Sequence, residues 1–264
     1  MTKPDSPLAD VRASSVAPAF QDPSAICRFG LIALSTDLTI EGDAARLFHD
    51  GTSAIHVTRV QHDNPTTPEN LRKMAPKLEA ATDLLVPSLP LAAILFACTS
   101  ASVSIGDAVV VDAIQRSRPD VPVVTPASAA VDAFKALGLR RLALVTPYLV
   151  ETTEPMAAYF KTAGFDLITA ECLGVADDRD IGRITTESII NAAKAADRPE
   201  VEGIFLSCTA LPAFGVIDDI EVALGKPVVT SNQSSFWKLC QISDLVAPEH
   251  APGTLFNLSR KRVI

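Results

Sequence analysis

Short apolar stretches alternate with segments of helical spacing from about residue 29 to about residue 239. The apolar stretches are rich in Val, Ile and Leu and lie at residues 30–35, 53–60, 91–97, 121–125, 142–146, 165–172, 203–207 and 227–230. The segments of helical spacing lie at residues 41–49, 69–82, 102–117, 127–137, 152–163, 180–196 and 234–240. Continuous apolar runs of strand length are typical of parallel strands that are buried on both faces. The pattern therefore predicts an α/β protein whose parallel sheets are covered by helices.

The landmarks of this pattern occur twice. Residues 31–36 resemble residues 142–147, and Pro-Val-Val-Thr occurs at residues 122–125 and again at 227–230. Cys-Thr follows an apolar strand twice as well, at Cys98 and at Cys208. The offset between the copies is nearly constant, which favours two similar four-stranded units over a single eight-fold barrel. Ligands of such sheets bind at the carboxyl ends of the strands, so two facing units bring both thiols to one shared cleft.

Each of these two cysteines precedes a predicted helix start. The amino terminus of a helix stabilises a thiolate, and its N–H groups hold a carboxylate with help from the hydroxyls of Thr99, Ser100 and Thr209. A thiolate on one face of a carbon removes a proton while a thiol on the other face returns one, which is racemisation or epimerisation without a cofactor. In the same geometry one thiolate adds to an activated double bond, and rotation and release give cis–trans isomerisation. The spacing alone leaves both reactions open.

The other candidate residues have plainer alternatives. A single strand-end cysteine is ordinarily a small buried apolar residue, and this structural role is expected of Cys27, Cys172 and Cys240. Tyr148 follows a strand, where its hydroxyl reaches either a ligand carboxylate or only a capping partner. Asp37 is a turn or helix-capping residue unless it contacts the ligand.

The composition narrows the function classes. The 264 residues carry a formal charge of −8, and a nucleic acid or an anionic membrane needs clustered Lys and Arg, so neither is an expected partner. Five cysteines without a Cys-x-x-Cys pair and four scattered histidines indicate reduced thiols in a cytoplasmic protein without a metal site. No apolar run approaches the roughly 20 residues of a membrane span. Residues 1–26 are expected to be a disordered leader, and residues 177–180, Asp-Asp-Arg-Asp, a solvated loop before a helix.

Four ordered motifs carry a resemblance to a known family. They are Cys98-Thr99-Ser100, Thr146-Pro147-Tyr148, Ser207-Cys208-Thr209-Ala210-Leu211 and Val229-Thr230-Ser231-Asn232-Gln233. The motifs resemble the aspartate/glutamate racemase superfamily and, within it, the maleate isomerase group and the related ectoine-utilisation proteins of the EutA type. The resemblance covers about residues 29–239.

This resemblance implies a cofactor-independent enzyme with two pseudo-symmetric domains, each a four-stranded, mainly parallel sheet flanked by helices, and an active site in the interdomain cleft. The implied catalytic pair is Cys98 and Cys208. The residues implied to surround the carboxylates of a small substrate are Thr99, Ser100, Tyr148 and Thr209. The resemblance also implies an exchange in which the last strand and helix return to the first domain. Residues 27–120 and 226–264 then form the first domain and residues 121–225 the second, and the chain forms a homo-oligomer.

One motif departs from the maleate isomerases. In the maleate isomerases the motif after the first strand resembles Pro-Ser-Ser-Asn, whereas this chain has Leu34-Ser35-Thr36-Asp37 at that place. An anionic Asp37 repels a dianion and is suited to hold an ammonium group instead. The Thr-Asp-Leu-Thr form resembles the ectoine-utilisation proteins and favours a racemase or isomerase acting on a diaminobutyrate-type amino acid of ectoine catabolism, with Asp37 as a substrate-binding residue.

Three other functions are weighed against this one. The first is maleate cis–trans isomerisation through a covalent cysteine adduct. The second, of a different class, is a non-catalytic small-molecule sensor, since two α/β lobes around a cleft also suit a ligand-binding protein. Arylmalonate decarboxylases also resemble this chain but keep only the second cysteine, so the presence of Cys98 argues against decarboxylation.

Overall fold

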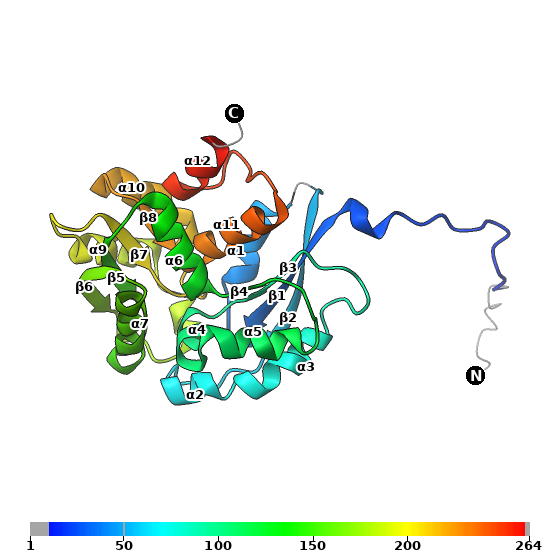
Figure 1. Ribbon diagram of the computed structural model, residues 1–264, viewed down its shortest axis with the longest axis horizontal. Helices are drawn as coiled ribbons and strands as arrows, with labels where there is room; N and C mark the ends of the chain where they lie inside the picture. Colours follow the sequence, from blue (N-terminus) through cyan, green and yellow to red (C-terminus); the bar gives the residue numbers. More distant parts are fainter. Residues whose placement is uncertain (1–10, 50, 262–264) are drawn as a thin grey trace, which may run out of the picture.

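The computed structural model describes residues 11–49 and 51–261, and two four-stranded sheets form its centre (Figure 1). All neighbouring strands within each sheet are parallel. The first sheet has the order β2-β1-β3-β4 and contains β1 (Cys27–Leu34), β2 (Ser53–Val60), β3 (Ala93–Phe96) and β4 (Val123–Val124). The second has the order β6-β5-β7-β8 and contains β5 (Arg141–Thr146), β6 (Asp166–Cys172), β7 (Gly203–Leu206) and β8 (Val228–Thr230). The predicted α/β fold with two parallel four-stranded sheets is confirmed.

Helices connect the strands as the alternating pattern predicts. In the first half they are α1 (Ile40–Leu47), α2 (Pro68–Arg72), α3 (Leu78–Asp83), α4 (Thr99–Ile105), α5 (Asp107–Gln115) and α6 (Pro126–Leu137). In the second half they are α7 (Val150–Thr162), α8 (Asp178–Ile181), α9 (Thr186–Ala196), α10 (Ile217–Leu224), α11 (Ser231–Ser243) and α12 (Gly253–Lys261). Single turns of 3-10 helix occur at η1 (Pro23–Ala25), η2 (Ala75–Lys77) and η3 (Phe214–Val216).

Three of the predicted helices are interrupted. The predicted helix over residues 180–196 is divided into α8 and α9 by residues 182–185, which are not helical. The predicted helix over residues 69–82 is divided into α2 and α3 by η2, which contains Pro76, because proline lacks the N–H that an α-helix needs. The predicted helix over residues 102–117 is divided into α4 and α5 at Gly106, whose φ of 96° favours glycine. Neither α10 nor α12 was predicted from the sequence.

Alternate residues of β1 and β3 face two different apolar cores. Phe29 and Leu31 belong to the larger core, which extends into the second half of the molecule, whereas Ile32 belongs to a smaller core beneath α2, α3 and α5. This alternation continues to the strand ends, where Cys98 lies in the smaller core and Cys208 in the larger. Both faces of the central strands β1 and β3 are therefore buried, as their continuous apolar runs predict, whereas the edge strand β2 is partly exposed.

The two halves exchange helices but not strands. The helix α6 follows β4 of the first sheet but packs on the second, where the Phe134 ring contacts Phe165 and Phe205. The helix α11 follows β8 of the second sheet but packs against α1, β3 and β4. In Figure 1 the two helices lie side by side between the sheets. Each half therefore receives one helix from the other.

The prediction that the last strand returns to the first domain is wrong. The last strand, β8, pairs with β7 in the second sheet rather than returning to the first, and β4 belongs to the first sheet although it lies within the predicted second domain, residues 121–225. The physical reason is that each proline-preceded strand pairs with the strand before it, and only the helix that follows crosses over. The helix after β8 does pack on the first sheet as predicted, and the domain boundaries themselves stay a prediction.

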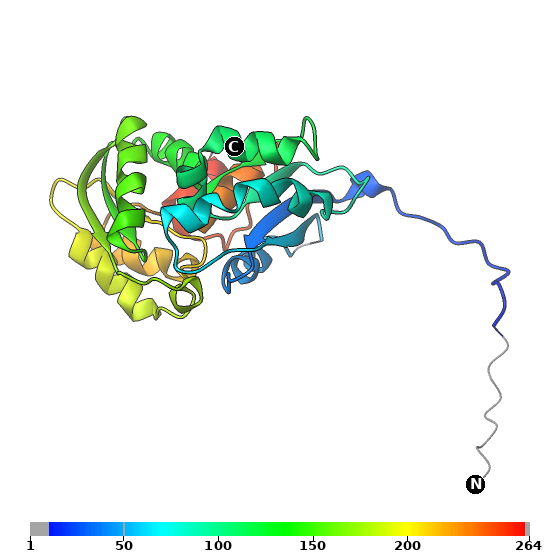
Figure 2. The same cartoon turned by 90° about the horizontal axis from the view of Figure 1, so that it is seen from below.

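The amino-terminal segment leads away from the body of the molecule. Residues 11–22 contain no helix or strand and extend from the first sheet in both views (Figures 1 and 2). The predicted leader covers residues 1–26, of which residues 1–10 lie outside the described part of the chain. Among the described residues, no helix is both long and apolar enough to cross a bilayer.

Candidate active site

Cys98 lies between the carboxyl end of β3 and the first turn of α4. Its sulfur accepts a hydrogen bond from the backbone N–H of Ala101 at 3.4 Å, which makes Cys98 the amino-terminal cap of the helix. The Ser100 hydroxyl lies 3.6 Å from the same sulfur. The side chain is 4% exposed. The predicted placement of this thiol at a strand end and a helix start is confirmed.

Cys208 follows β7 in a different local structure. No helix starts here, because residues 209–213 form a turn and the next helical turn begins at Phe214, so the predicted helix start is wrong. The φ of Cys208 is 146°, a backbone conformation that residues other than glycine rarely adopt. It costs about 1–3 kcal/mol. The hydroxyl of Ser231 accepts the Cys208 N–H at 3.0 Å and helps to hold this conformation. Strained residues of this kind cluster at functional sites.

Tyr148 joins the two cysteines. Its side chain is 1% exposed, and its hydroxyl lies in hydrogen-bonding reach of the Cys208 thiol and the Ser100 hydroxyl. Burial raises the pKa of Tyr148 well above its usual value, and nearby Cys208 and Cys98 raise it further. The phenol is therefore a neutral donor between the thiols rather than a surface group. Predicted residues from both halves, Cys98, Ser100, Tyr148 and Cys208, thus lie together.

Both thiols are protonated at neutral pH in this buried state. Burial raises the pKa of Cys98 to about 12, although the Ser100 hydroxyl and the Ala101 N–H lower it. Burial also raises the pKa of Cys208 well above its usual value, and Asp178 adds to this effect. Desolvation thus outweighs the stabilisation that the helix terminus gives to a thiolate. A reactive thiolate requires a change of environment when the substrate enters.

Two buried carboxyl groups accompany the thiols. One Asp37 oxygen accepts the N–H groups of Thr39 and Ile40 at 2.7 and 2.9 Å, so its predicted role in the turn before α1 is confirmed. Burial raises the pKa of Asp37 to about 6, and the charge of Asp178 contributes to the rise. Asp178 is 2% exposed and accepts the Thr36 hydroxyl at 2.6 Å.

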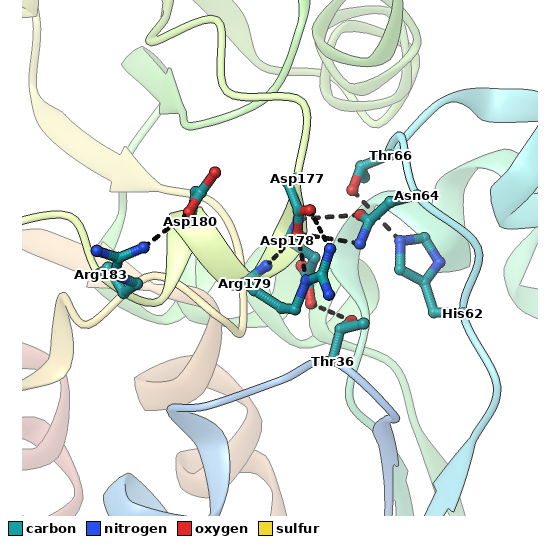
Figure 3. A network of polar contacts seen from close by, with 9 residues as sticks. All are labelled: Thr36, His62, Asn64, Thr66, Asp177, Asp178, Arg179, Asp180 and Arg183. Carbon is teal, nitrogen blue, oxygen red and sulfur yellow. Dashed lines mark hydrogen bonds and ion pairs between the residues drawn. The ribbon is translucent and has the colours of Figure 1, made fainter.

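The segment that contains Asp178 was predicted to be a solvated loop, and for this residue the prediction is wrong. Asp177, Asp178, Asn64 and Thr36 form one polar network across the two halves (Figure 3). The amide of Asn64 donates to Asp177 at 3.0 Å and its carbonyl oxygen accepts the Asp178 N–H at 3.0 Å. Arg179 and Asp180 of the same segment are exposed, as predicted. The network buries Asp178 because it fixes the first turn of α8 against the first half.

The loop that supplies Asn64 makes further contacts with the second half. The Thr66 N–H donates to the carbonyl of Ala176 at 2.9 Å, and the Thr152 hydroxyl donates to the carbonyl of Thr66 at 2.8 Å. His62 is 6% exposed and lies 3.3 Å from the Thr66 hydroxyl through Nε2 (Figure 3). This loop therefore binds the second half of the molecule beside the network that contains Asp177 and Asp178.

The threonines of the two Cys-Thr motifs bind across the halves in a reciprocal way. The Thr99 hydroxyl donates to the Ser231 hydroxyl at 2.7 Å, and Ser231 in turn holds the Cys208 N–H. The Thr209 hydroxyl donates to the carbonyl of Ala97, the residue before Cys98, at 2.9 Å. Both hydroxyl protons are therefore engaged with protein rather than free for a substrate carboxylate. Each threonine steadies the backbone next to the cysteine of the other motif.

Asn232 and Asp43 extend this contact. The Asn232 amide donates to the Asp43 carboxylate at 2.8 Å and to the carbonyl of Thr209 at 3.0 Å. Burial raises the pKa of Asp43 to about 6, although Asn232 lowers it. In the part of the chain that the structure describes, no group of three or more His, Cys, Asp or Glu side chains is arranged to hold a metal ion.

The chain resembles known enzymes over most of its length. The family model described as arylmalonate decarboxylase matches residues 76–256. A maleate isomerase of Nocardia farcinica is 28% identical over 239 residues, which are 86% of this chain and 94% of that protein. A maleate isomerase of Alcaligenes faecalis is 24% identical and covers 81% of this chain and 89% of its own length.

Solved structures show the same likeness. A mutant of the Nocardia farcinica maleate cis-trans isomerase with a covalently bound succinylcysteine intermediate has a TM-score of 0.79 and 26% identity, covering 88% of this chain and 98% of that one. A double mutant of arylmalonate decarboxylase in the liganded form has a TM-score of 0.78 at 24% identity, which shows the shared fold. Since the family model covers more than half of the sequence, this chain belongs to the arylmalonate decarboxylase family.

Proposed function

We propose that this protein is a cofactor-independent isomerase that interconverts the cis and trans forms of a small unsaturated carboxylate through a covalent cysteine adduct. The observation that carries the proposal is the approach of Cys98 and Cys208, one from each half, to the same buried tyrosine. The two maleate isomerases similar to this chain support the choice of reaction, and one of them has been solved with a succinylcysteine adduct. The racemase reading favoured by the sequence is less well supported.

The reaction needs one thiolate and one thiol. In the reactive form the thiolate sulfur adds to one alkene carbon and forms a C–S bond. The π electron pair moves to the neighbouring carbon, which takes a proton from the other cysteine. The former double bond is now single and rotates. The second cysteine then takes the proton back, the C–S bond breaks, and the trans alkene leaves with both cysteines restored.

Several groups beside the cysteines assist these steps. The Tyr148 hydroxyl and the Ser100 hydroxyl lie beside the thiols and are donors to the carboxylate on which negative charge develops. The backbone N–H groups of Thr99 and Ser100 at the start of α4 are further donors, whereas that of Ala101 is already bound to the Cys98 sulfur. Thr99 and Thr209 contribute by position, because their hydroxyls brace the backbone at the two cysteines.

A second candidate is racemisation or epimerisation of a diaminobutyrate-type amino acid, as in the ectoine-utilisation proteins of the EutA type. Asp37 favours it, since a buried carboxyl beside the cysteines suits an ammonium group. In this reaction the two thiols exchange a proton at the α-carbon, and no C–S bond forms. For either reaction we propose a cytoplasmic homo-oligomer, and light scattering of the purified protein tests its size.

Proton NMR in deuterated water distinguishes the candidates. The panel contains maleate, cis-4-aminobut-2-enoate, aspartate and 2,4-diaminobutyrate. A trans alkene from either unsaturated compound supports the isomerase. Loss of the α-proton signal from an amino acid without any alkene product supports the racemase. Binding without either change supports the third possibility, a small-molecule sensor, and contradicts an enzyme acting on this panel.

A further inference from the structure

Two buried carboxyl groups, one from each half of the chain, lie beside the paired thiols. Asp37 is 1% exposed and Asp178 is 2% exposed. They are linked through Thr36, which precedes Asp37 and donates its hydroxyl to Asp178 at 2.6 Å. The charges of both aspartates act on both thiols, since each raises the pKa of Cys98 and of Cys208. The chain geometry agrees, since Ile32 lies opposite Phe96 in the paired strands that precede Asp37 and Cys98. The Thr39 hydroxyl also donates to the carbonyl of Ala210, two residues after Cys208, at 2.6 Å. The two aspartates therefore lie beside the cysteines.

One oxygen of this pair has no partner. The Oδ1 of Asp37 accepts two backbone N–H groups from the start of α1, whereas its Oδ2 is buried without a hydrogen bond among the described residues. A buried carboxylate oxygen without a partner is costly, so such atoms in native proteins are normally satisfied by a protein group, a water molecule, an ion or a ligand. The free oxygen belongs to the carboxyl group whose charge reaches Asp178 and both thiols.

The protein supplies little positive charge to this pair. Arg59 is the cation whose charge acts on Asp37, but its guanidinium donates to the carbonyls of Leu34 and Asp37 and pairs with Glu41 at 2.8 Å. The Arg59 side chain is 39% exposed, so its charge is screened by water. The Asp178 carboxylate accepts the Thr36 hydroxyl but forms no ion pair among those the structure gives for the described residues. The site therefore has an excess of buried negative charge.

We infer that the substrate is a small carboxylate that also carries a positively charged nitrogen, and that Asp37 and Asp178 hold this nitrogen and determine the specificity. The inference rests on the proposed function in that it uses the same cleft. A carboxylate of the substrate binds the donors Tyr148 and Ser100, and the charged nitrogen binds the free oxygen of Asp37 on the acidic side. A dicarboxylate instead brings a second negative charge against two buried acids, which is unfavourable in a site that excludes water.

Isothermal titration calorimetry with matched ligands tests this inference. Maleate and cis-4-aminobut-2-enoate share the cis alkene and one carboxylate, and differ in whether the other end is a carboxylate or an ammonium group. The wild-type protein should bind the ammonium compound at least about tenfold more tightly, the difference expected of a charged hydrogen bond. Asp37→Asn and Asp178→Asn should each reduce this preference by about tenfold, because an amide carries no charge.

The control variant is Asp180→Asn. Asp180 lies in the same short helix as Asp178 but is exposed and pairs with Arg183, so its loss should leave the preference unchanged. Thermal unfolding of each variant shows whether it is folded, and the wild-type comparison needs no variant. Tighter binding of maleate, binding of neither ligand, or a preference that both asparagine variants retain would overturn the inference.

The binding and turnover measurements distinguish a failure of the inference on specificity from a failure of the proposed reaction. If the ammonium compound binds as expected but neither alkene is isomerised, the inference on specificity stands and the proposed reaction is wrong. If maleate is converted to fumarate and binds more tightly than the ammonium compound, the proposed reaction stands and the inference on specificity is wrong.

Discussion

The two Cys-Thr motifs have nearly the same sequence but different local structures. Cys98 caps a helix and receives the Ala101 N–H at its sulfur, whereas Cys208 has a φ of 146° and is followed by a turn. The Cys208 sulfur lies against the Tyr148 phenol, and its backbone is held by Ser231. A repeated sequence has thus produced two unequal thiols. The difference suits a division of work in which one cysteine is the nucleophile and the other the proton carrier.

Replacing each cysteine tests this division with the largest expected effect. Cys98→Ser and Cys208→Ser should each lower turnover on the order of 10³-fold, because each removes a reacting atom. Only one of the two variants should accumulate a covalent adduct with the substrate, detected by mass spectrometry of the intact protein. Cys172→Ser, at the end of β6, is the control and should retain activity. Adducts in both variants would contradict the division.

Tyr148 tests whether the phenol links the two thiols. Tyr148→Phe keeps the buried ring but removes the hydroxyl that reaches Cys208 and Ser100. We expect kcat to fall about 10²-fold, as for the loss of one donor to a developing negative charge. Steady-state kinetics measure the loss. Tyr159→Phe is the matched control because the Tyr159 hydroxyl donates to Asp107 instead. Equal losses in both variants would indicate a structural effect.

Substitution of Asp37 tests the effect of a buried carboxyl group that acts on both thiols. Burial raises its pKa from 3.8 to about 6, so the folded state favours the protonated form. Protonated Asp37 therefore stabilises the folded state. This contribution to the free energy of unfolding is complete below the unfolded pKa near 4 and is lost as the pH rises through about 6. Asp37→Asn should therefore raise the free energy of unfolding at pH 7 by up to about 3 kcal/mol and change it little at pH 4. Urea unfolding at the two pH values measures this, and a gain of the same size at both would contradict it.

Ser231 gives the smallest expected effect and the sharpest distinction between the motifs. Ser231→Ala leaves the buried N–H of Cys208 without an acceptor, which should lower the free energy of unfolding by about 1–2 kcal/mol. Alkylation by iodoacetamide, followed by peptide mass spectrometry, should become faster at Cys208 and change less at Cys98. Ser231 also accepts the Thr99 hydroxyl beside Cys98, but the contacts of the Cys98 sulfur with Ser100 and Ala101 remain. Ser235→Ala is the control, since its hydroxyl donates only within α11. An equal acceleration at both cysteines would contradict this difference between the motifs.

The sequence predicted much of the fold because its central strands are apolar runs buried on both faces. It also predicted the approach of Cys98 and Cys208, since each follows a strand at the shared edge, whereas only the family resemblance placed Tyr148 beside them. The exchange of helices without an exchange of strands was not predictable. The strands β4 and β8 both follow a proline in similar sequences, and the sheet that each one joins is decided by contacts distant in the sequence. Hydrophobic spacing at Ile217, Ile220 and Leu224 was a usable signal for α10.

Asp178 shows why part of the site escaped prediction. In sequence it lies among charged residues, which is typical of a solvated segment. It is buried only because Thr36, 142 residues away, and Asn64 bind it across the two halves. The different backbone at Cys208 was hidden in the same way, since the contact that fixes it comes from Ser231 on another element. Contacts of this range leave no mark in a local pattern.

The exchanged helices have a consequence for how the molecule is assembled. The ring of Phe134 on α6 completes the aromatic core of the second sheet, while Phe236 on α11 packs against Phe48 of the first half. Neither sheet is fully covered until the whole chain from β1 to α11 has been synthesised. The two halves therefore fold and unfold as a single cooperative unit, and a fragment cut between β4 and β5 carries a helix whose apolar face has no sheet to cover.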